Sequence, residues 1–154
     1  MTQIGFRKPS NASATGKYYT EFLKIGANAT AAKMLPGIAV VFDTNDRSVK
    51  EAGADGDVIG FLGYEETPIA FKPATRATAY ALLDTAAVHH GRGGFVRALL
   101  AISQTVVKGE RLSVAADGYL TIATIGTHDV VADAEESVTT TGDATGVIWV
   151  SMRR

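Results

Sequence analysis

The histidines are the first residues to consider for chemistry in this sequence. His89 and His90 are adjacent, and His128 stands next to Asp129. A zinc or iron site needs three or four converging ligands. Adjacent side chains on a strand point to opposite faces, so His89 and His90 are poorly placed to chelate one metal ion. We interpret the histidines as solvated loop or strand residues, and we predict no metal and no cofactor.

Paired carboxylates are the second candidate, because glycosidases use two of them. The pairs are Glu65–Glu66 and Glu135–Glu136, and each follows an apolar segment. That position favours charged strand ends that face water. The serines lack the Gly-x-Ser-x-Gly pattern of a hydrolase nucleophile. The sequence therefore predicts no catalytic residue and no enzymatic activity, and a small β-barrel hydrolase is the enzymatic alternative.

Two glycine-containing segments match nucleotide-binding and nucleic-acid-binding motifs only in part. Residues 14–17 are Ala-Thr-Gly-Lys, but a phosphate loop needs a glycine where Asn11 stands and a Ser or Thr where Tyr18 stands. Residues 91–94, Gly-Arg-Gly-Gly, are a single RGG-like copy. With 15 basic and 16 acidic residues, the net charge is −1. We predict loops here, and no nucleic-acid partner.

Composition limits the elements that could position such residues. The 154 residues suit one domain, or one domain plus an arm. The chain has no cysteine, so disulfides cannot stabilise it. It has no run of about 18 apolar residues, so we predict no membrane association. The N-terminal residues are polar and show no secretion signal, which predicts synthesis in the host cytoplasm.

Short apolar segments bounded by turn residues predict a mainly β protein. Asp117–Gly118 between two such segments is a strong hairpin signal. Asn45 lies in a second turn, since its side chain can bond to its own backbone. We predict strands at residues 38–42, 47–50, 58–62, 95–102, 108–114, 119–123, 129–132 and 147–150.

Residues 73–90 fit two structures. The proline followed by many alanines is compatible with a helix. The alternation of Arg76, Thr78 and Tyr80 with small apolar residues favours a hairpin, which we adopt.

A shift of 72 residues aligns two halves of the body without a gap. It places Gly37 on Gly109, Asn45 on Asp117, and residues 57–60 on 129–132. We interpret this as an internal duplication of a strand–turn–strand–turn–strand unit. Chance similarity between hairpins is the alternative.

The segment before residue 35 differs from the rest, because its apolar residues are scattered among small polar ones. It is either a disordered tail or an arm that orders on a partner. We predict an N-terminal arm at residues 1–34 and a β-rich domain at residues 35–154. The predicted binding residues of the arm are Ile4, Phe6, Tyr18, Tyr19 and Phe22.

Residues 34–62 resemble the opening of the lambda-type head-decoration proteins of tailed phages. An apolar strand is followed by Asp43-Thr44, a polar turn, Arg47 and a valine strand, and residues 53–62 continue the pattern. Residues 78–81 are similar to the next hairpin of that family. Residues 107–118 are similar to a broader group of phage capsid accessory proteins, so the resemblance covers roughly residues 34–125.

The resemblance implies a compact β-barrel or β-tulip body with short helical or coil insertions and an extended N-terminal arm. It implies a structural virion protein that binds the outer surface of an assembled capsid and stabilises it. The expected partner is the phage major capsid protein, and the expected assembly is a homotrimer. Because the present chain is longer at its C-terminus than the short lambda-type members, its strand order is expected to differ in detail.

One alternative function remains, a carbohydrate-binding β module displayed on the virion. Sugar-binding modules need an exposed aromatic platform. The sequence offers Tyr64, Tyr80, Tyr119 and Trp149 for it.

Overall fold

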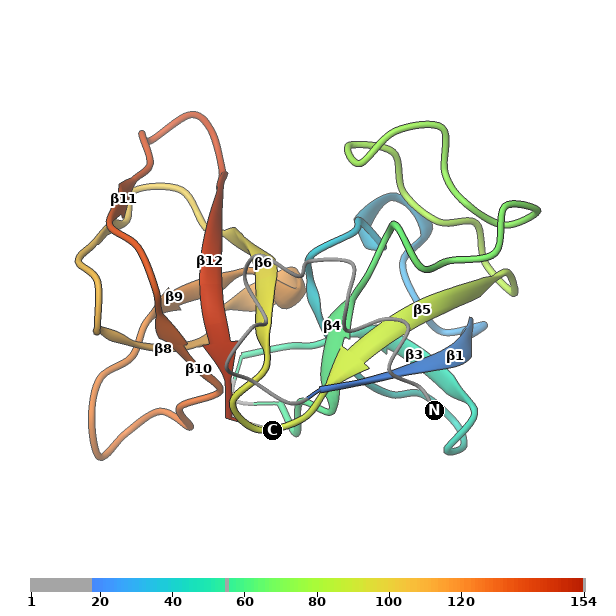
Figure 1. Cartoon of the computed structure of the whole chain (residues 1–154), viewed down its shortest axis with the longest axis horizontal. Helices are drawn as coiled ribbons and strands as arrows, with labels where there is room; N and C mark the ends of the chain where they lie inside the picture. The colour runs from blue at the N-terminus through green and yellow to red at the C-terminus, as the bar shows by residue number, and fades with distance from the viewer. Residues whose placement is uncertain (1–17, 55, 154) are drawn as a thin grey trace.

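The computed structural model describes residues 18–54 and 56–153, and two closed β-barrels lie side by side in it (Figure 1). The predicted mainly β class is confirmed, but the body is a pair of barrels where the sequence suggested a single one. The described residues contain two short 3₁₀ turns, η1 (Ala31–Lys33) and η2 (Ala116–Gly118), and no α-helix. None of the described helices is long and apolar enough to cross a membrane.

The first barrel has the strand order β1-β3-β2-β4-β5 and closes by pairing of β5 with β1. The β1–β3 pair is parallel and the other pairs are antiparallel. Its strands are β1 (Tyr19–Ile25), β2 (Ala39–Phe42), β3 (Ser48–Glu51), β4 (Gly60–Leu62) and β5 (Thr85–His90).

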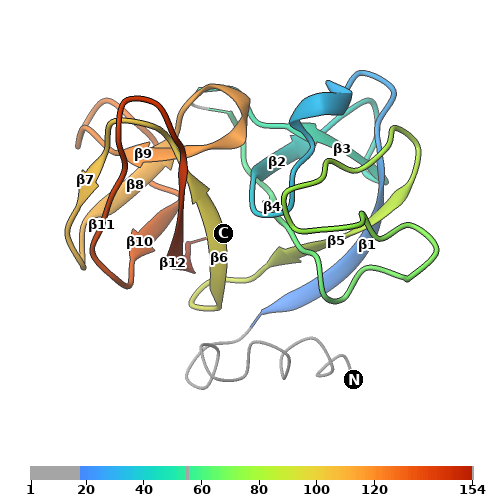
Figure 2. The ribbon, with the colours of Figure 1, turned by 90° about the horizontal axis from the view of Figure 1, so that it is seen from above.

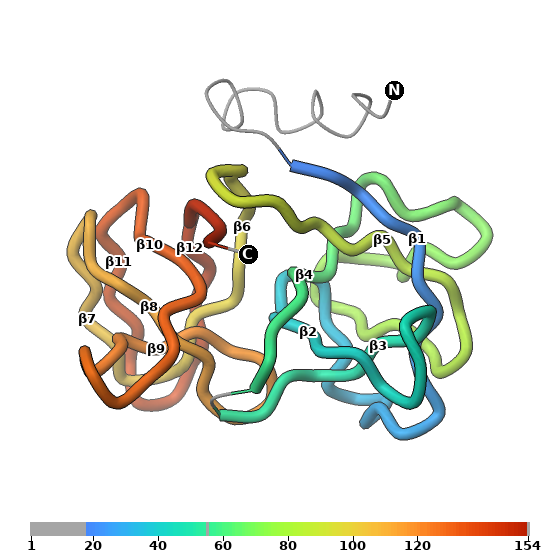
Figure 3. The backbone as a smooth tube through the Cα atoms, turned by 90° about the horizontal axis from the view of Figure 1, so that it is seen from below, coloured from blue at the N-terminus to red at the C-terminus, as the bar shows by residue number. Residues whose placement is uncertain are grey.

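The second barrel has the order β10-β12-β6-β9-β8 and begins directly after residues 91–94, which connect β5 to β6 (Figure 3). Its strands are β6 (Phe95–Leu100), β8 (Arg111–Val114), β9 (Leu120–Ile122), β10 (Ala132–Ala134) and β12 (Gly146–Met152). A small two-stranded sheet of β7 (Thr105–Val106) and β11 (Val138–Thr139) lies beside it.

The two barrels repeat one topology, as the 72-residue offset predicts. In each, the first strand pairs in parallel with the third, and the fifth strand closes the barrel against the first. The offset places β2 on β8, β3 on β9 and β4 on β10. Gly37 and Gly109, which it also equates, both have a left-handed backbone, with φ of 101° and 96°.

Both predicted turns are present. The Asn45 side chain accepts a hydrogen bond from the Arg47 backbone N–H at 2.8 Å, which reverses the chain between β2 and β3. Asp117 and Gly118 both have positive φ, and they join the antiparallel strands β8 and β9.

Strands β2 and β4 are buried on both faces, which explains why the sequence shows unbroken apolar runs there. Val40 and Leu62 point into the interior of the first barrel. Their neighbours Ala39 and Phe61 point the other way, into the core cluster that contains the interior of the second barrel. One strand therefore serves two cores, because alternate residues face opposite sides.

The barrels meet at backbone groups as well as side chains. The Leu99 N–H donates a hydrogen bond of 3.0 Å to the Gly37 carbonyl, and the Gly37 N–H donates one of 2.8 Å to the Leu62 carbonyl. At Gly118, a Cβ atom would lie 2.6 Å from the carbonyl oxygen of Ala39. A glycine is required there, because any side chain would push the two barrels apart.

The structure differs from the predicted arm of residues 1–34. Residues 18–34 belong to the first barrel: β1 pairs with β5 and β3, and Leu23, Ile25 and Met34 are buried in its core. These apolar residues look scattered in sequence because their partners come from strands far along the chain. Ile4 and Phe6 lie outside the described residues.

Residues 73–84 are an irregular loop, so the predicted hairpin over 73–90 is wrong in its first half. Only its second half forms a strand, β5. The alternating pattern of residues 76–80 does not come from strand pairing. It contains one buried anchor, Tyr80, whose N–H donates a hydrogen bond of 2.9 Å to the Met34 carbonyl. The predicted strand at 129–132 forms slightly later, as β10.

We expect Gly118→Ala to destabilise the chain more than Gly126→Ala does. Both glycines have a left-handed backbone, with φ of 80° and 87°, so each alanine should cost about 1–2 kcal/mol of unfolding free energy. Only Gly118 faces the other barrel closely, and the clash should add about 1–3 kcal/mol. Urea unfolding measures both variants, and equal losses would show that the junction has room for a methyl group.

Candidate functional site

A groove of about 490 Å³ lies between the two barrels in the described part of the chain. Ligand sites usually measure about 300–1,000 Å³ and often lie between structural units. Both barrels line it, and so does Tyr18, which directly precedes β1. We call it the inter-barrel groove.

The second barrel forms one wall through the outward faces of β6 and β12. Residues of β12 alternate, so Ile148 and Val150 fill the barrel while Trp149 points outward. Trp149 lies opposite Arg97 in the ladder, and the Arg97 guanidinium is 5.8 Å from the indole ring centroid. Tyr119, between η2 and β9, also lines the groove.

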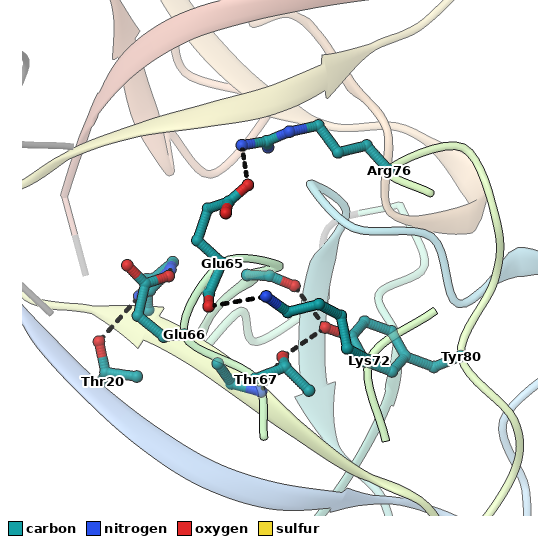
Figure 4. Close-up of polar contacts among 10 residues, drawn as sticks. Thr20, Glu65, Glu66, Thr67, Lys72, Arg76 and Tyr80 are labelled. Atoms are coloured by element: carbon teal, nitrogen blue, oxygen red, sulfur yellow. Dashed lines mark hydrogen bonds and ion pairs between the residues drawn. The ribbon is translucent and has the colours of Figure 1, made fainter. Parts of the chain in front are cut away.

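The first barrel forms the other wall through the segment after β4. The Arg76 guanidinium lies 5.3 Å from the Tyr64 ring centroid and 2.7 Å from the Glu65 carboxylate. The Lys72 ammonium lies 5.1 Å from the same ring, and it donates a hydrogen bond to the Glu65 carbonyl (Figure 4). The Tyr64 hydroxyl donates to the Pro73 carbonyl at 3.0 Å, so this ring is held at both ends.

A buried polar cluster stands at the same place, where the sequence suggested solvated groups. His89 Nε2 lies 3.1 Å from the Glu66 carboxylate, and both side chains are at most 10% exposed. His89 Nδ1 is 3.0 Å from the Thr20 hydroxyl (Figure 4). The interpretation of His89 and Glu66 as water-facing residues is therefore wrong, because the segment after β4 folds back over β5.

The neighbouring His90 pairs elsewhere, with the Glu21 carboxylate at 2.8 Å. The two histidines thus face different partners, as adjacent strand residues should. Among the described residues, no group of three or more His, Asp or Glu is placed to hold a metal ion.

Tyr18 is buried against this cluster, with its ring edge-on to His89 at 5.3 Å between centroids. Burial raises the pKa of the Tyr18 phenol well above its ordinary value, and the Glu66 carboxylate raises it further. Burial also raises the pKa of Tyr119. Both phenols therefore remain neutral hydrogen-bonding groups at neutral pH.

Comparison with known proteins finds similar folds among solved structures. No protein-family model matches the chain, and no curated protein matches it. The chain is similar to the crystal structure of the head fiber gp8.5 N base in bacteriophage phi29, with 10% sequence identity and a TM-score of 0.48. The match covers 88% of this chain and 94% of that one.

The N-terminal half of β1 is a second candidate surface. Strand β3 pairs with β1 only at Lys24 and Ile25, whereas β5 pairs with it from Tyr19 to Lys24. The Lys24 N–H points toward β3 and donates to the Arg47 carbonyl. By alternation, the N–H and C=O of Thr20 and Phe22 point to that same side, where no described strand lies. We call this segment, Tyr19–Leu23, the β1 edge.

The predicted arm residues separate into three groups. Tyr19 and Phe22 lie on the β1 edge and are 56% and 54% exposed. Tyr18 is buried in the inter-barrel groove, so it is not part of that exposed surface. Ile4 and Phe6 lie outside the described ranges. Sequence reasoning missed Arg97 and the Arg76–Glu65 pair, because isolated charged residues carry no signal of what they face.

Three of the four aromatic residues that the sequence offers for a sugar-binding platform lie in one groove. Tyr64, Tyr119 and Trp149 line the inter-barrel groove. Tyr80 does not, because it is 1% exposed and forms part of a buried relay. In that relay, the Tyr80 hydroxyl donates to the Gly63 carbonyl at 2.7 Å and accepts from Thr67 at 2.5 Å, while the Thr67 oxygen accepts from the Ala87 N–H (Figure 4).

We expect Tyr80→Phe to lower the free energy of unfolding by about 1–3 kcal/mol, because it leaves the Gly63 carbonyl and the Thr67 hydroxyl without a buried partner. Thermal or urea unfolding measures this. Tyr19→Phe, at an exposed tyrosine, is the matched control and should change the value by less than about 0.5 kcal/mol.

The same substitution should also change the response to alkali. Burial raises the pKa of Tyr80 from 10.0 to about 12. The folded state therefore favours the neutral phenol, and this contribution to stability is complete below pH 10 and is lost as the pH rises through 12. Between these values, unfolding free energy should fall less steeply in Tyr80→Phe than in the wild type, and identical slopes would contradict the assignment.

Proposed function

We propose that this chain is a non-enzymatic structural virion protein that binds the outer surface of an assembled phage capsid and stabilises it. The resemblance of residues 34–125 to head-decoration and capsid accessory proteins supports the assignment. For the phi29 head-fiber base, a place on the phage head is part of its name. For the present chain, a place on the phage head is a proposal, and the chain's own residues indicate how it would bind there.

The β1 edge is the observation that carries the proposal. It combines backbone groups that face no described strand with two aromatic side chains that are more than half exposed. An extended segment of a partner can add to such an edge, with backbone hydrogen bonds providing affinity and side chains providing specificity. In the first barrel, β1 has the longest stretch that pairs with a described strand on one side only, so we assign this edge to a strand of the major capsid protein.

Ile4 and Phe6 come shortly before the β1 edge in the chain, and we assign them to the same contact. An arm and an adjacent edge that bind one shell act as linked sites, and linked weak sites give strong binding. A protein that binds only the assembled shell stabilises that shell by mass action. No catalytic step is required.

We expect Thr20→Pro to weaken binding to capsids of the virus that encodes the chain by at least about tenfold, or about 1.4 kcal/mol. Proline removes an N–H that points away from β5, so it should be tolerated on this edge and leave the barrel folded. Cosedimentation with purified empty capsids measures the binding.

Thr20→Val is the matched control, because it keeps the backbone N–H and removes only the hydroxyl that contacts His89. It should bind as the wild type does. A second variant lacking residues 2–17 tests the preceding segment and leaves β1 intact, so it should also lose binding without a change in thermal unfolding. Wild-type occupancy of capsids by Thr20→Pro would disprove the role of the β1 edge.

We also propose that the chain is a homotrimer on the capsid. Closed rotational symmetry matches the threefold and quasi-threefold positions of a shell, and three copies would present three β1 edges at once. Cryo-electron microscopy of decorated capsids should show groups of three copies around these positions. Single isolated copies in that map would contradict the trimer.

A further inference from the structure

The inter-barrel groove is separate from the β1 edge and has its own chemistry. Its aromatic rings include Tyr64 after β4, Tyr119 before β9, and Trp149 on β12. Two arginines stand with them, one on each wall. The capsid contact proposed above uses none of these residues.

The side chains of the groove are held in place before any ligand binds. Arg97 stacks on Trp149 across the β6–β12 ladder, and Arg76 is held between the Tyr64 ring and the Glu65 carboxylate. Preorganised side chains lose little conformational entropy on binding, so contacts with them contribute more to affinity. Among the described residues Arg97 forms no ion pair, so its donors are available.

The groove walls offer little free backbone. Strand β12 pairs with β6 and β10, and β4 pairs with β2 and β5. Strand β6 pairs with β9 only at Leu100, and on that side the Leu99 N–H donates a hydrogen bond to the Gly37 carbonyl of the first barrel. What the groove presents to a ligand is mainly side chains, namely aromatic faces and planar polar groups.

Those two kinds of group match the two surfaces of a sugar ring. The C–H face of a pyranose is apolar and can lie against an aromatic ring, while its hydroxyls both donate and accept hydrogen bonds. A guanidinium offers a fixed fork of donors, and a carboxylate offers acceptors. We propose that the inter-barrel groove binds an oligosaccharide, with a sugar ring against Trp149 and with Arg97 and the Arg76–Glu65 pair bound to its hydroxyls.

Trp149 is the only tryptophan of the chain, so its fluorescence reports on the groove directly. The full chain is titrated with maltohexaose and chitohexaose as neutral probes, with a polygalacturonate hexamer as an acidic probe, and on an array of bacterial surface polysaccharides. Saturable binding that changes Trp149 emission is expected for at least one probe. The proposal would be overturned if none of these probes showed binding that depends on Trp149 or Arg97.

Three variants test the residues. Trp149→Ala should weaken binding by about tenfold or more, and Arg97→Gln should weaken it several-fold while Trp149 emission remains as the readout. Phe71→Ala, which removes an exposed aromatic residue outside the groove, is the control and should bind normally. Since Trp149→Ala could disturb the barrel, Arg97→Gln keeps the test valid, and wild-type affinity in Arg97→Gln would remove Arg97 from the site.

Other occupants of the groove give distinct results. Trp149 emission that shifts when residues 2–17 are deleted would assign the groove to the chain's own N-terminal segment and overturn the proposal. Emission that changes with protein concentration alone would assign it to a second copy, with the same consequence. Capsid binding is tested separately, because Trp149→Ala should still bind capsids and Thr20→Pro should still bind the oligosaccharide.

Discussion

The contact between the two barrels is the constraint on which the rest of the structure depends. Gly37 and Gly118 allow the barrels to approach at backbone distance, and the hydrogen bond from Leu99 to Gly37 fixes their alignment. Around this point, Ala39 and Phe61 of the first barrel pack into the core cluster of the second. Close packing of this kind leaves little freedom for one barrel to move against the other.

Figure 2 shows the two barrels side by side, and the inter-barrel groove follows from their alignment. Each barrel alone would present Trp149 or Tyr64 as an isolated surface ring, with no facing wall. Once the junction is fixed, the outward face of β6 and β12 lies opposite the segment after β4. The buried pair of His89 and Glu66 stands at the same seam, so the pairing of these polar side chains also helps to hold that segment in place.

Closure of the barrels decides where the chain can bind a partner by its backbone. A closed barrel has no free edges, so most strands here cannot accept another strand. Strand β1 keeps such an edge, because β3 begins only at Ser48 and Tyr19–Leu23 therefore pair with a described strand on one side only. The two candidate surfaces thus differ in kind: the β1 edge offers backbone groups, and the groove offers side chains.

The sequence by itself determined most strands after residue 35, the turns at Asn45 and Asp117–Gly118, and the 72-residue repeat, because alternation and turn chemistry are local properties. Only the tertiary structure decided that residues 18–34 complete a barrel, that Tyr80 is buried, and that Glu66 and His89 pair. Each of these outcomes depends on contacts between distant segments, and local sequence patterns contain no information about such contacts.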